Sequence, residues 1–135
     1  MAIRVTAMDH IVLRVHDLDA ALHFYEGLLG LDVEGRSEFS SGLRPFVSVR
    51  VGDQLIDLWP DDKYNSELGT RHGGLSHFCL RVAGNLETNV IPQLRRAGID
   101  LLEPSPTERF GATGYGNSIY VRDPDGYMLE LKESN

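Results

Sequence analysis

The stretch HIVLRV, residues 10–15, decides the fold because it returns as HFCLRV at residues 77–82. In both stretches every second residue after the histidine is apolar, which indicates a β-strand with one buried face. Each stretch begins with a histidine, and a helical pattern follows each of them. The sequence therefore predicts two copies of one supersecondary unit within a single chain.

The segments after these two strands also match, element for element. Residues 17–30 (DLDAALHFYEGLLG) and 85–98 (NLETNVIPQLRRAG) each begin with a capping residue, carry apolar residues at helical spacing and end in glycine. Pro92 would bend the second helix, since it lacks a backbone N–H. Shorter extended stretches follow: LDVEGR, PFVSVRVG and QLIDLW in the first half, and IDLLE, NSIYVRD and YMLELKE in the second. This order, βαβββ twice, predicts an α+β protein.

Composition limits the kind of protein this is. We expect one domain over residues 1–135, with module one at about 7–60, a linker at about 61–74 and module two at about 75–133. The formal net charge of -7, without a basic stripe, argues against a nucleic-acid partner. Neither a membrane span nor a signal peptide is indicated. With Cys79 as the only cysteine, we expect no internal disulfide and a cytoplasmic location.

The parity of positions along the strands places four metal-binding residue types on one side of the predicted sheets. His10 and His77 point away from the face that would pack on the helices, and Asp57 and Glu130 do the same on the closing strands. Two imidazoles and one or two carboxylates suit Fe, Mn, Ni, Co or Zn. We predict one divalent metal ion on His10, His77 and Glu130, with Asp57 either reaching the metal or acting as a base beside it. The unmatched histidines are expected on the surface: His16, His23 and His72.

The residues around these sites resemble a known family. The opening residues 9–31 (DHIVLRVHDLDAALHFYEGLLGL) and the closing residues 118–133 (SIYVRDPDGYMLELKE) are similar to the two signatures of the vicinal-oxygen-chelate superfamily. The resemblance implies the glyoxalase/bleomycin resistance/dihydroxybiphenyl dioxygenase fold, in which two βαβββ modules with curled mixed sheets form a cup around a metal. It also implies a homodimer, with the cup completed either within one chain or between chains.

Bacterial glyoxalase I matches by position among members with known chemistry. The resemblance carries its ligands onto His10, Asp57, His77 and Glu130, with aspartate replacing a glutamate at the second position. Arg14 matches an arginine that helps to hold glutathione, whereas Asp61 stands where asparagine is expected. The implied activity is a metal-dependent lyase or isomerase reaction on a small oxygen-bearing molecule, with or without a thiol co-substrate. Asp57 or Glu130 would move the proton.

Other members of the superfamily give alternative interpretations. Fosfomycin-inactivating thiol transferases share Ser118 and Tyr120, but their lysine before that strand and their arginine beyond the last strand have no counterpart here. Extradiol Fe(II) dioxygenases share the pattern from Tyr120 to Glu130, but residues 111–113 lack their histidine. Bleomycin-resistance proteins sequester a drug without metal chemistry, and several aromatic residues would suit such a groove: Phe46, Trp59, Tyr115 and Tyr120.

The glycine-rich stretch TERFGATGYGN, residues 107–117, shows neither a helix nor a strand pattern. We interpret it either as a turn or as a lid over the substrate. In a lid, Arg109 would suit an anionic substrate. The predicted substrate-binding residues are Arg14, Trp59, Arg109, Tyr115, Ser118 and Tyr120.

Overall fold

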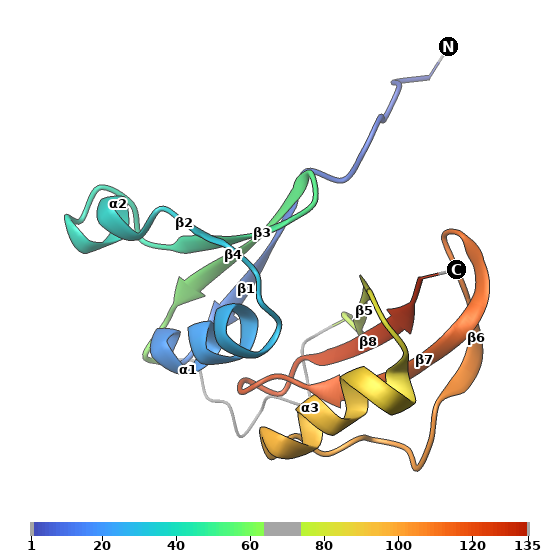
Figure 1. The fold of residues 1–135 in the computed structure, drawn as a ribbon. Helices are drawn as coiled ribbons and strands as arrows, with labels where there is room; N and C mark the ends of the chain where they lie inside the picture. Colours follow the sequence, from blue (N-terminus) through green and yellow to red (C-terminus); the bar gives the residue numbers. More distant parts are fainter. Residues whose placement is uncertain (1, 64–73, 135) are drawn as a thin grey trace. The chain divides into compact units, whose positions relative to one another are not determined.

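The computed structural model describes residues 2–63 and 74–134. The chain divides into two compact units, Met1–Tyr64 and Asn65–Asn135, coloured from blue to green and from yellow-green to red in Figure 1. Each unit contains one open four-stranded sheet with both parallel and antiparallel neighbours. The predicted fold class, with two βαβββ modules and mixed sheets, is therefore confirmed.

The first sheet has the order β1-β4-β3-β2. Its strands are β1 (His10–Val15), β2 (Val33–Glu34), β3 (Val47–Val51) and β4 (Gln54–Pro60). β1 runs parallel to β4, and the other neighbours are antiparallel. Gly52, with a φ of 57°, makes the tight turn between β3 and β4. A short helix that the pattern did not predict, α2 (Arg36–Ser40), lies between β2 and β3.

The second sheet repeats this topology in the order β5-β8-β7-β6. Its strands are β5 (Phe78–Val82), β6 (Thr107–Gly111), β7 (Gly114–Arg122) and β8 (Met128–Glu133). In the turn from β7 to β8, Asp123 Oδ1 accepts hydrogen bonds from the backbone N–H groups of Asp125 and Tyr127, at 2.9 and 3.0 Å. This turn leads into the register that sets Tyr120 opposite Glu130.

The helical segments begin at the predicted caps. Asp17 accepts a hydrogen bond from the Ala20 N–H at the start of α1 (Leu18–Leu22), which continues as the π-helix η1 (His23–Leu28). Asn85 caps the π-helix η3 (Leu86–Val90) in the same way, and α3 (Ile91–Arg96) follows. Pro92 lies in the first turn of α3, where an α-helix tolerates a missing N–H. Within the described ranges, no helix is long and apolar enough to cross a membrane.

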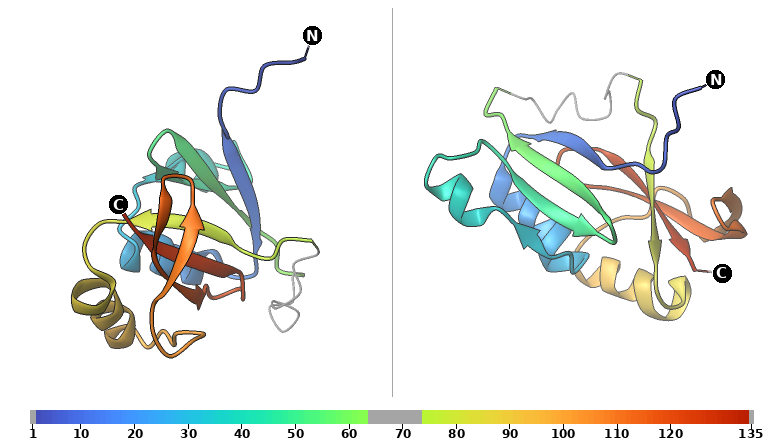
Figure 2. Two further views of the ribbon diagram at one scale, coloured as in Figure 1. Left: turned by 90° about the vertical axis from the view of Figure 1, so that its right-hand side faces the viewer. Right: turned by 90° about the horizontal axis from the view of Figure 1, so that it is seen from above.

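The helices cover one face of each sheet, and that face is apolar, as the parity predicts. Figure 2 shows α1 on one side of the first sheet and α3 on one side of the second. The residues buried there are Leu13, Val15, Ala21, Tyr25, Ile56 and Leu58 in the first unit, and Leu86, Ile91, Leu94, Ile119, Leu129 and Leu131 in the second. Each large apolar side chain buried in this way contributes about 1.5–3 kcal/mol. The opposite face of each sheet is left for polar side chains.

Two expectations about the second unit are wrong. The stretch IDLLE, residues 99–103, is not a strand; only the Leu102 N–H pairs with the sheet, at Tyr120 O. The prolines that follow, Pro104 and Pro106, cannot donate to a ladder. The strand next in order is instead β6, within the stretch 107–117 that shows no strand pattern.

The glycine-rich stretch is therefore a β-hairpin. Gly111 lies opposite Gly114 at its tip, and Arg109 lies opposite Gly116. Gly114 adopts a φ of 106°, which other residues rarely adopt. A smaller difference is that β5 begins at Phe78, one residue after the histidine that was expected to open it.

Candidate functional site

The first unit brings His10 and Asp57 together. His10 is the first residue of β1 and Asp57 lies on the adjacent strand β4, with His10 Nε2 3.9 Å from Asp57 Oδ2. Asp57 is only 6% exposed. The other ring nitrogen of His10, Nδ1, lies 2.7 Å from Asp9 Oδ2, and this hydrogen bond raises the pKa of His10 above its ordinary value. Asp9 thus holds Nδ1 of His10 in place, while Nε2 faces the Asp57 carboxylate.

Asp57 is held by residues that the sequence pattern did not identify. Ser48, directly opposite on β3, donates a 2.6 Å hydrogen bond from its hydroxyl to Asp57 Oδ1. Arg44 Nη2 donates to Ser48 Oγ at 2.7 Å, and Arg44 Nε donates to Phe46 O at 3.0 Å. A signal was present, since Ser48 interrupts the apolar run FVSV on the same face as Asp57.

The second unit brings His77 and Glu130 together. His77 Nε2 lies 3.2 Å from Glu130 Oε1, and Ser76 Oγ lies 3.1 Å from His77 Nδ1. Glu130 on β8 is 6% exposed. Its other oxygen, Oε2, is buried and has no hydrogen-bond partner within the described part of the chain. The site therefore holds a carboxylate oxygen that nothing in the described protein satisfies.

This arrangement fits a divalent metal ion. An unpaired buried carboxylate oxygen is costly, and a carboxylate beside an imidazole is a ligand pair for Zn, Fe, Mn, Co or Ni. Within residues 2–63 and 74–134, no group of three or more His, Cys, Asp and Glu side chains forms a complete metal site. Each unit by itself supplies one imidazole and one carboxylate, so the joint ligation by His10, His77 and Glu130 stays a prediction.

Three of the predicted substrate-binding residues gather next to this pair. The Tyr120 ring meets the His77 ring edge-on, with centroids 5.1 Å apart. The guanidinium group of Arg109 lies over the Tyr120 ring, with Cζ 4.3 Å from the ring centroid. Nη1 of Arg109 donates a hydrogen bond to Ser118 Oγ at 2.9 Å. Glu103 holds Arg109 through a 2.7 Å contact to Nη2. Arg109 is therefore part of the sheet face rather than of a separate lid.

Burial and the charge of Glu130 favour the neutral form of the Tyr120 phenol. Its partial burial is the larger cause and the negative charge of Glu130 the next, and together they raise the pKa of Tyr120 above its ordinary value. A phenol that keeps its proton can donate a hydrogen bond. Tyr120 thus offers an O–H donor on the sheet face that carries Glu130.

Of the other predicted substrate-binding residues, Arg14 and Trp59 belong to the first unit and Tyr115 to the hairpin of the second. Arg14 is exposed on β1, with Nε 3.3 Å from Asp61 Oδ2. Trp59 stacks on Phe46, with centroids 4.9 Å apart and planes at 9°. Tyr115 is 66% exposed, touches Phe110 near the hairpin tip, and has the parity on β7 opposite to that of Ser118 and Tyr120.

His16 and His23 are exposed, which confirms the prediction that they lie on the surface. His72 lies outside the described residues.

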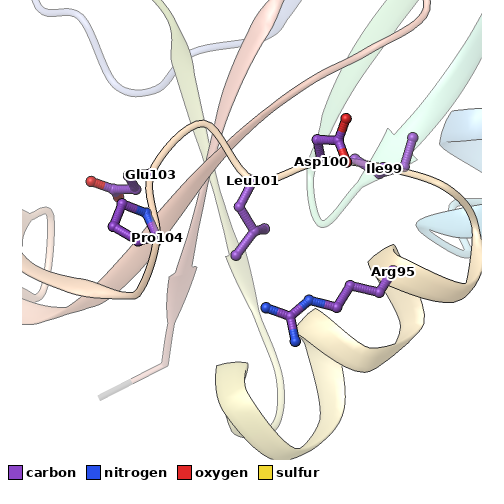
Figure 3. A pocket seen from close by; sticks show the side chains of 6 residues that line it. All are labelled: Arg95, Ile99, Asp100, Leu101, Glu103 and Pro104. Carbon is purple, nitrogen blue, oxygen red and sulfur yellow. The ribbon is translucent and has the colours of Figure 1, made fainter.

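One cavity of the second unit lies beside Glu130, and another lies beyond α3. The first, of about 170 Å³, is lined by Glu130 together with Arg81, Gly111, Thr113 and Lys132, among other residues. The other, of about 340 Å³, lies between the end of α3 and the following loop, and Figure 3 shows Arg95 extending toward Leu101 there. Its lining residues are Arg95, Ile99, Asp100, Leu101, Glu103 and Pro104. Only the smaller cavity contains a predicted metal ligand.

Comparison with known proteins identifies relatives along nearly the whole chain. The profile of the Glyoxalase/Bleomycin resistance protein/Dioxygenase superfamily matches residues 7–131. "Virulence protein STM3117" of Salmonella typhimurium is 30% identical, over 96% of this chain and 85% of its own. "Lactoylglutathione lyase" of Escherichia coli O157:H7 is 32% identical, over 92% and 90%. The crystal structure of a glyoxalase/dioxygenase from Nostoc punctiforme superposes with a TM-score of 0.72 at 20% identity, over 100% and 99% of the two chains.

Proposed function

Because the chain belongs to the Glyoxalase/Bleomycin resistance protein/Dioxygenase superfamily, we propose that it is a metal-dependent, glyoxalase-like lyase or isomerase. Its substrate would be a small molecule with two neighbouring oxygen atoms. The observation that carries the proposal is Glu130, whose buried Oε2 has no partner in the described chain while Oε1 lies 3.2 Å from His77 Nε2. His10 is proposed as the third ligand only because it occupies the same position in the first sequence repeat as His77 does in the second.

The residues divide the chemical work between them. A divalent metal ion on this ligand set would polarise the neighbouring oxygens of the substrate. Glu130, or Asp57 through the Oδ2 that faces His10, would accept the proton from one carbon and return it to the next. The Tyr120 O–H would donate a hydrogen bond to a substrate oxygen, while Arg109 and Glu103 keep its ring in place. A homodimer and a cytoplasmic location are part of the same proposal.

One relative's name supports a lyase as the first activity to test, because "Lactoylglutathione lyase" is matched over most of both chains. Sequestration of a ligand without catalysis is the second candidate. It is favoured by the Phe46–Trp59 stack, in which Trp59 remains 38% exposed. Such a flat aromatic surface suits a planar ligand.

The test uses the full chain without a His tag, stripped of metal and reloaded separately with Mn, Fe, Ni, Co or Zn. Methylglyoxal with glutathione is the first substrate, and catechol under anaerobic iron loading followed by oxygen is the second. Turnover of methylglyoxal with at least one metal, lost in His77→Ala and kept in the exposed control His23→Ala, is the expected result.

Other outcomes separate the alternatives. Metal-dependent cleavage of catechol alone would replace the lyase with a dioxygenase. Equal turnover in His77→Ala and wild type would refute the proposed site. Tight binding of a planar ligand by His77→Ala, with no turnover by any form of the protein, would favour sequestration.

A further inference from the structure

The 170 Å³ cavity beside Glu130 contains two positive charges that the proposed function does not use. Lys132 follows Glu130 by two positions on β8, so both side chains point to the same face of the sheet. Arg81 comes from the neighbouring strand β5, with which Lys132 is in register. Lys132 is only 5% exposed, which is uncommon for a lysine because its charged group is costly to bury.

Gly111 makes room for this lysine. A Cβ atom at Gly111 would lie 2.8 Å from Lys132 Cε and 3.4 Å from Nζ. Gly111 is not among the glycines with positive φ, so its backbone does not require glycine. The missing side chain therefore serves to let the Lys132 stem run across the hairpin and bring its ammonium group to the cavity wall.

Cys79 also lines this cavity. It lies directly opposite Glu130 in the pairing of β5 with β8, and Arg81 lies directly opposite Lys132. The carboxylate and both cations therefore share one electrostatic environment. The Thr113 side chain adds a hydroxyl group to the same wall.

We propose that this cavity binds an acidic group of the substrate, a carboxylate or a phosphonate, through Lys132 and Arg81. The inference rests on the proposed function, because it names the substrate class for that site. Residues two apart on a strand are roughly 6–7 Å apart, so the acidic group would lie a few bonds from the oxygens that bind near Glu130. The substrate then carries an acidic group in addition to its two neighbouring oxygens.

Phosphate and acetate are suitable probes because they share the oxyanion chemistry with such a substrate. The metal-free, ¹⁵N-labelled full chain is titrated with inorganic phosphate, and separately with acetate, at constant ionic strength. Amide shifts are expected at Gly111, Ala112 and Thr113. In Lys132→Met, which keeps the stem but removes the charge, the dissociation constant for phosphate should rise by about tenfold or more. Arg95→Met, at the other cavity, should leave it unchanged.

Two further variants cover the case in which Lys132→Met fails to fold. Gly111→Ala must displace Lys132 from its path, and Arg81→Met removes the second cation without touching β8. Both should weaken phosphate binding. Unchanged binding in Lys132→Met, or in both further variants, would overturn the inference, as would amide shifts confined to other segments.

The readout separates this inference from the proposed function because it requires no metal. A chain that takes up metal and turns over methylglyoxal but shows no phosphate shift at the hairpin overturns only the acidic-substrate inference. Phosphate binding that depends on Lys132, in a chain that binds no metal, supports the anion cavity and overturns the proposed function.

Discussion

Ser48 donates a 2.6 Å hydrogen bond from its buried hydroxyl to Asp57 Oδ1. This contact leaves only Oδ2 of Asp57 facing His10 Nε2, at 3.9 Å. At the equivalent position of the second unit, Tyr120 stands opposite Glu130, and Glu130 Oε2 has no partner within the described residues. The two carboxylates are therefore not equivalent, and Glu130 is the one suited to bind a metal directly.

Metal affinity should reflect this difference. Glu130→Gln should weaken metal binding by more than about 100-fold, because changes to residues that only support a ligand already cost about 10 to 100-fold. Asp57→Asn should have a smaller effect, since Ser48 already occupies one oxygen. Competition with a chromophoric chelator measures both dissociation constants. A greater loss in Asp57→Asn than in Glu130→Gln would reverse the assignment of the two roles.

Removing the Ser48 hydroxyl should destabilise the fold. Ser48→Ala leaves Asp57 Oδ1 buried without its donor, which should lower the free energy of unfolding by about 1–3 kcal/mol. Urea denaturation followed by circular dichroism measures the change. Ser37→Ala, at an exposed hydroxyl, should stay within about 0.5 kcal/mol of the wild type. Equal values for the two variants would contradict the importance of the Ser48–Asp57 contact.

The pKa of His10 should depend on Asp9. The hydrogen bond from His10 to Asp9 favours the imidazolium, so Asp9→Asn should lower the raised pKa of His10. The stabilising contribution of this pair is present at pH values below the unfolded pKa and is lost as pH rises through the folded one. NMR titration of the His10 ring protons in metal-free protein tests this, with Asp19→Asn as a control for net charge. An unchanged His10 titration in Asp9→Asn would rule out the hydrogen bond as the cause.

The Cys79 thiol should react slowly. Partial loss of solvation, followed by the charge of Glu130, raises the pKa of Cys79 from 9.0 to about 11, so its thiolate fraction at pH 8 is about 100-fold lower than that of an unperturbed thiol. The residue is exposed, so access does not limit the reaction. Ellman's reagent should react faster with Glu130→Gln, and faster still with urea-unfolded protein. Rapid reaction of the native wild type would contradict the raised pKa.

The sequence predicts those features that depend on periodicity. Alternation along β1 and β5, capping by Asp17 and Asn85, and the equal order of elements are enough to place the apolar faces and the fold class. The same parity sets Asp57 and Glu130 on the polar faces. These features depend on residues close together in the sequence, so a single sequence is enough to predict them.

Features that depend on contacts between distant residues could not be predicted in this way. The hairpin at residues 107–117 is rich in glycine, which has low β-propensity. The pairing of β6 with β7 and the contact of Arg109 with Tyr120 stabilise it. Ile99 to Glu103 has strand-like composition but is followed by two prolines. The role of Ser48 becomes visible only once β3 is paired in register with β4.

Metal content gives the most direct test of the central claim, that His77 and Glu130 hold a divalent ion. Elemental mass spectrometry is applied to the untagged chain, wild type beside His77→Ala and the control His23→Ala, as purified and after incubation with Mn, Fe, Ni, Co or Zn. The account predicts about one equivalent of metal in the wild type and His23→Ala, and loss of that metal in His77→Ala. A wild type that retains none of these metals, or a His77→Ala variant that retains as much as the wild type, would contradict it.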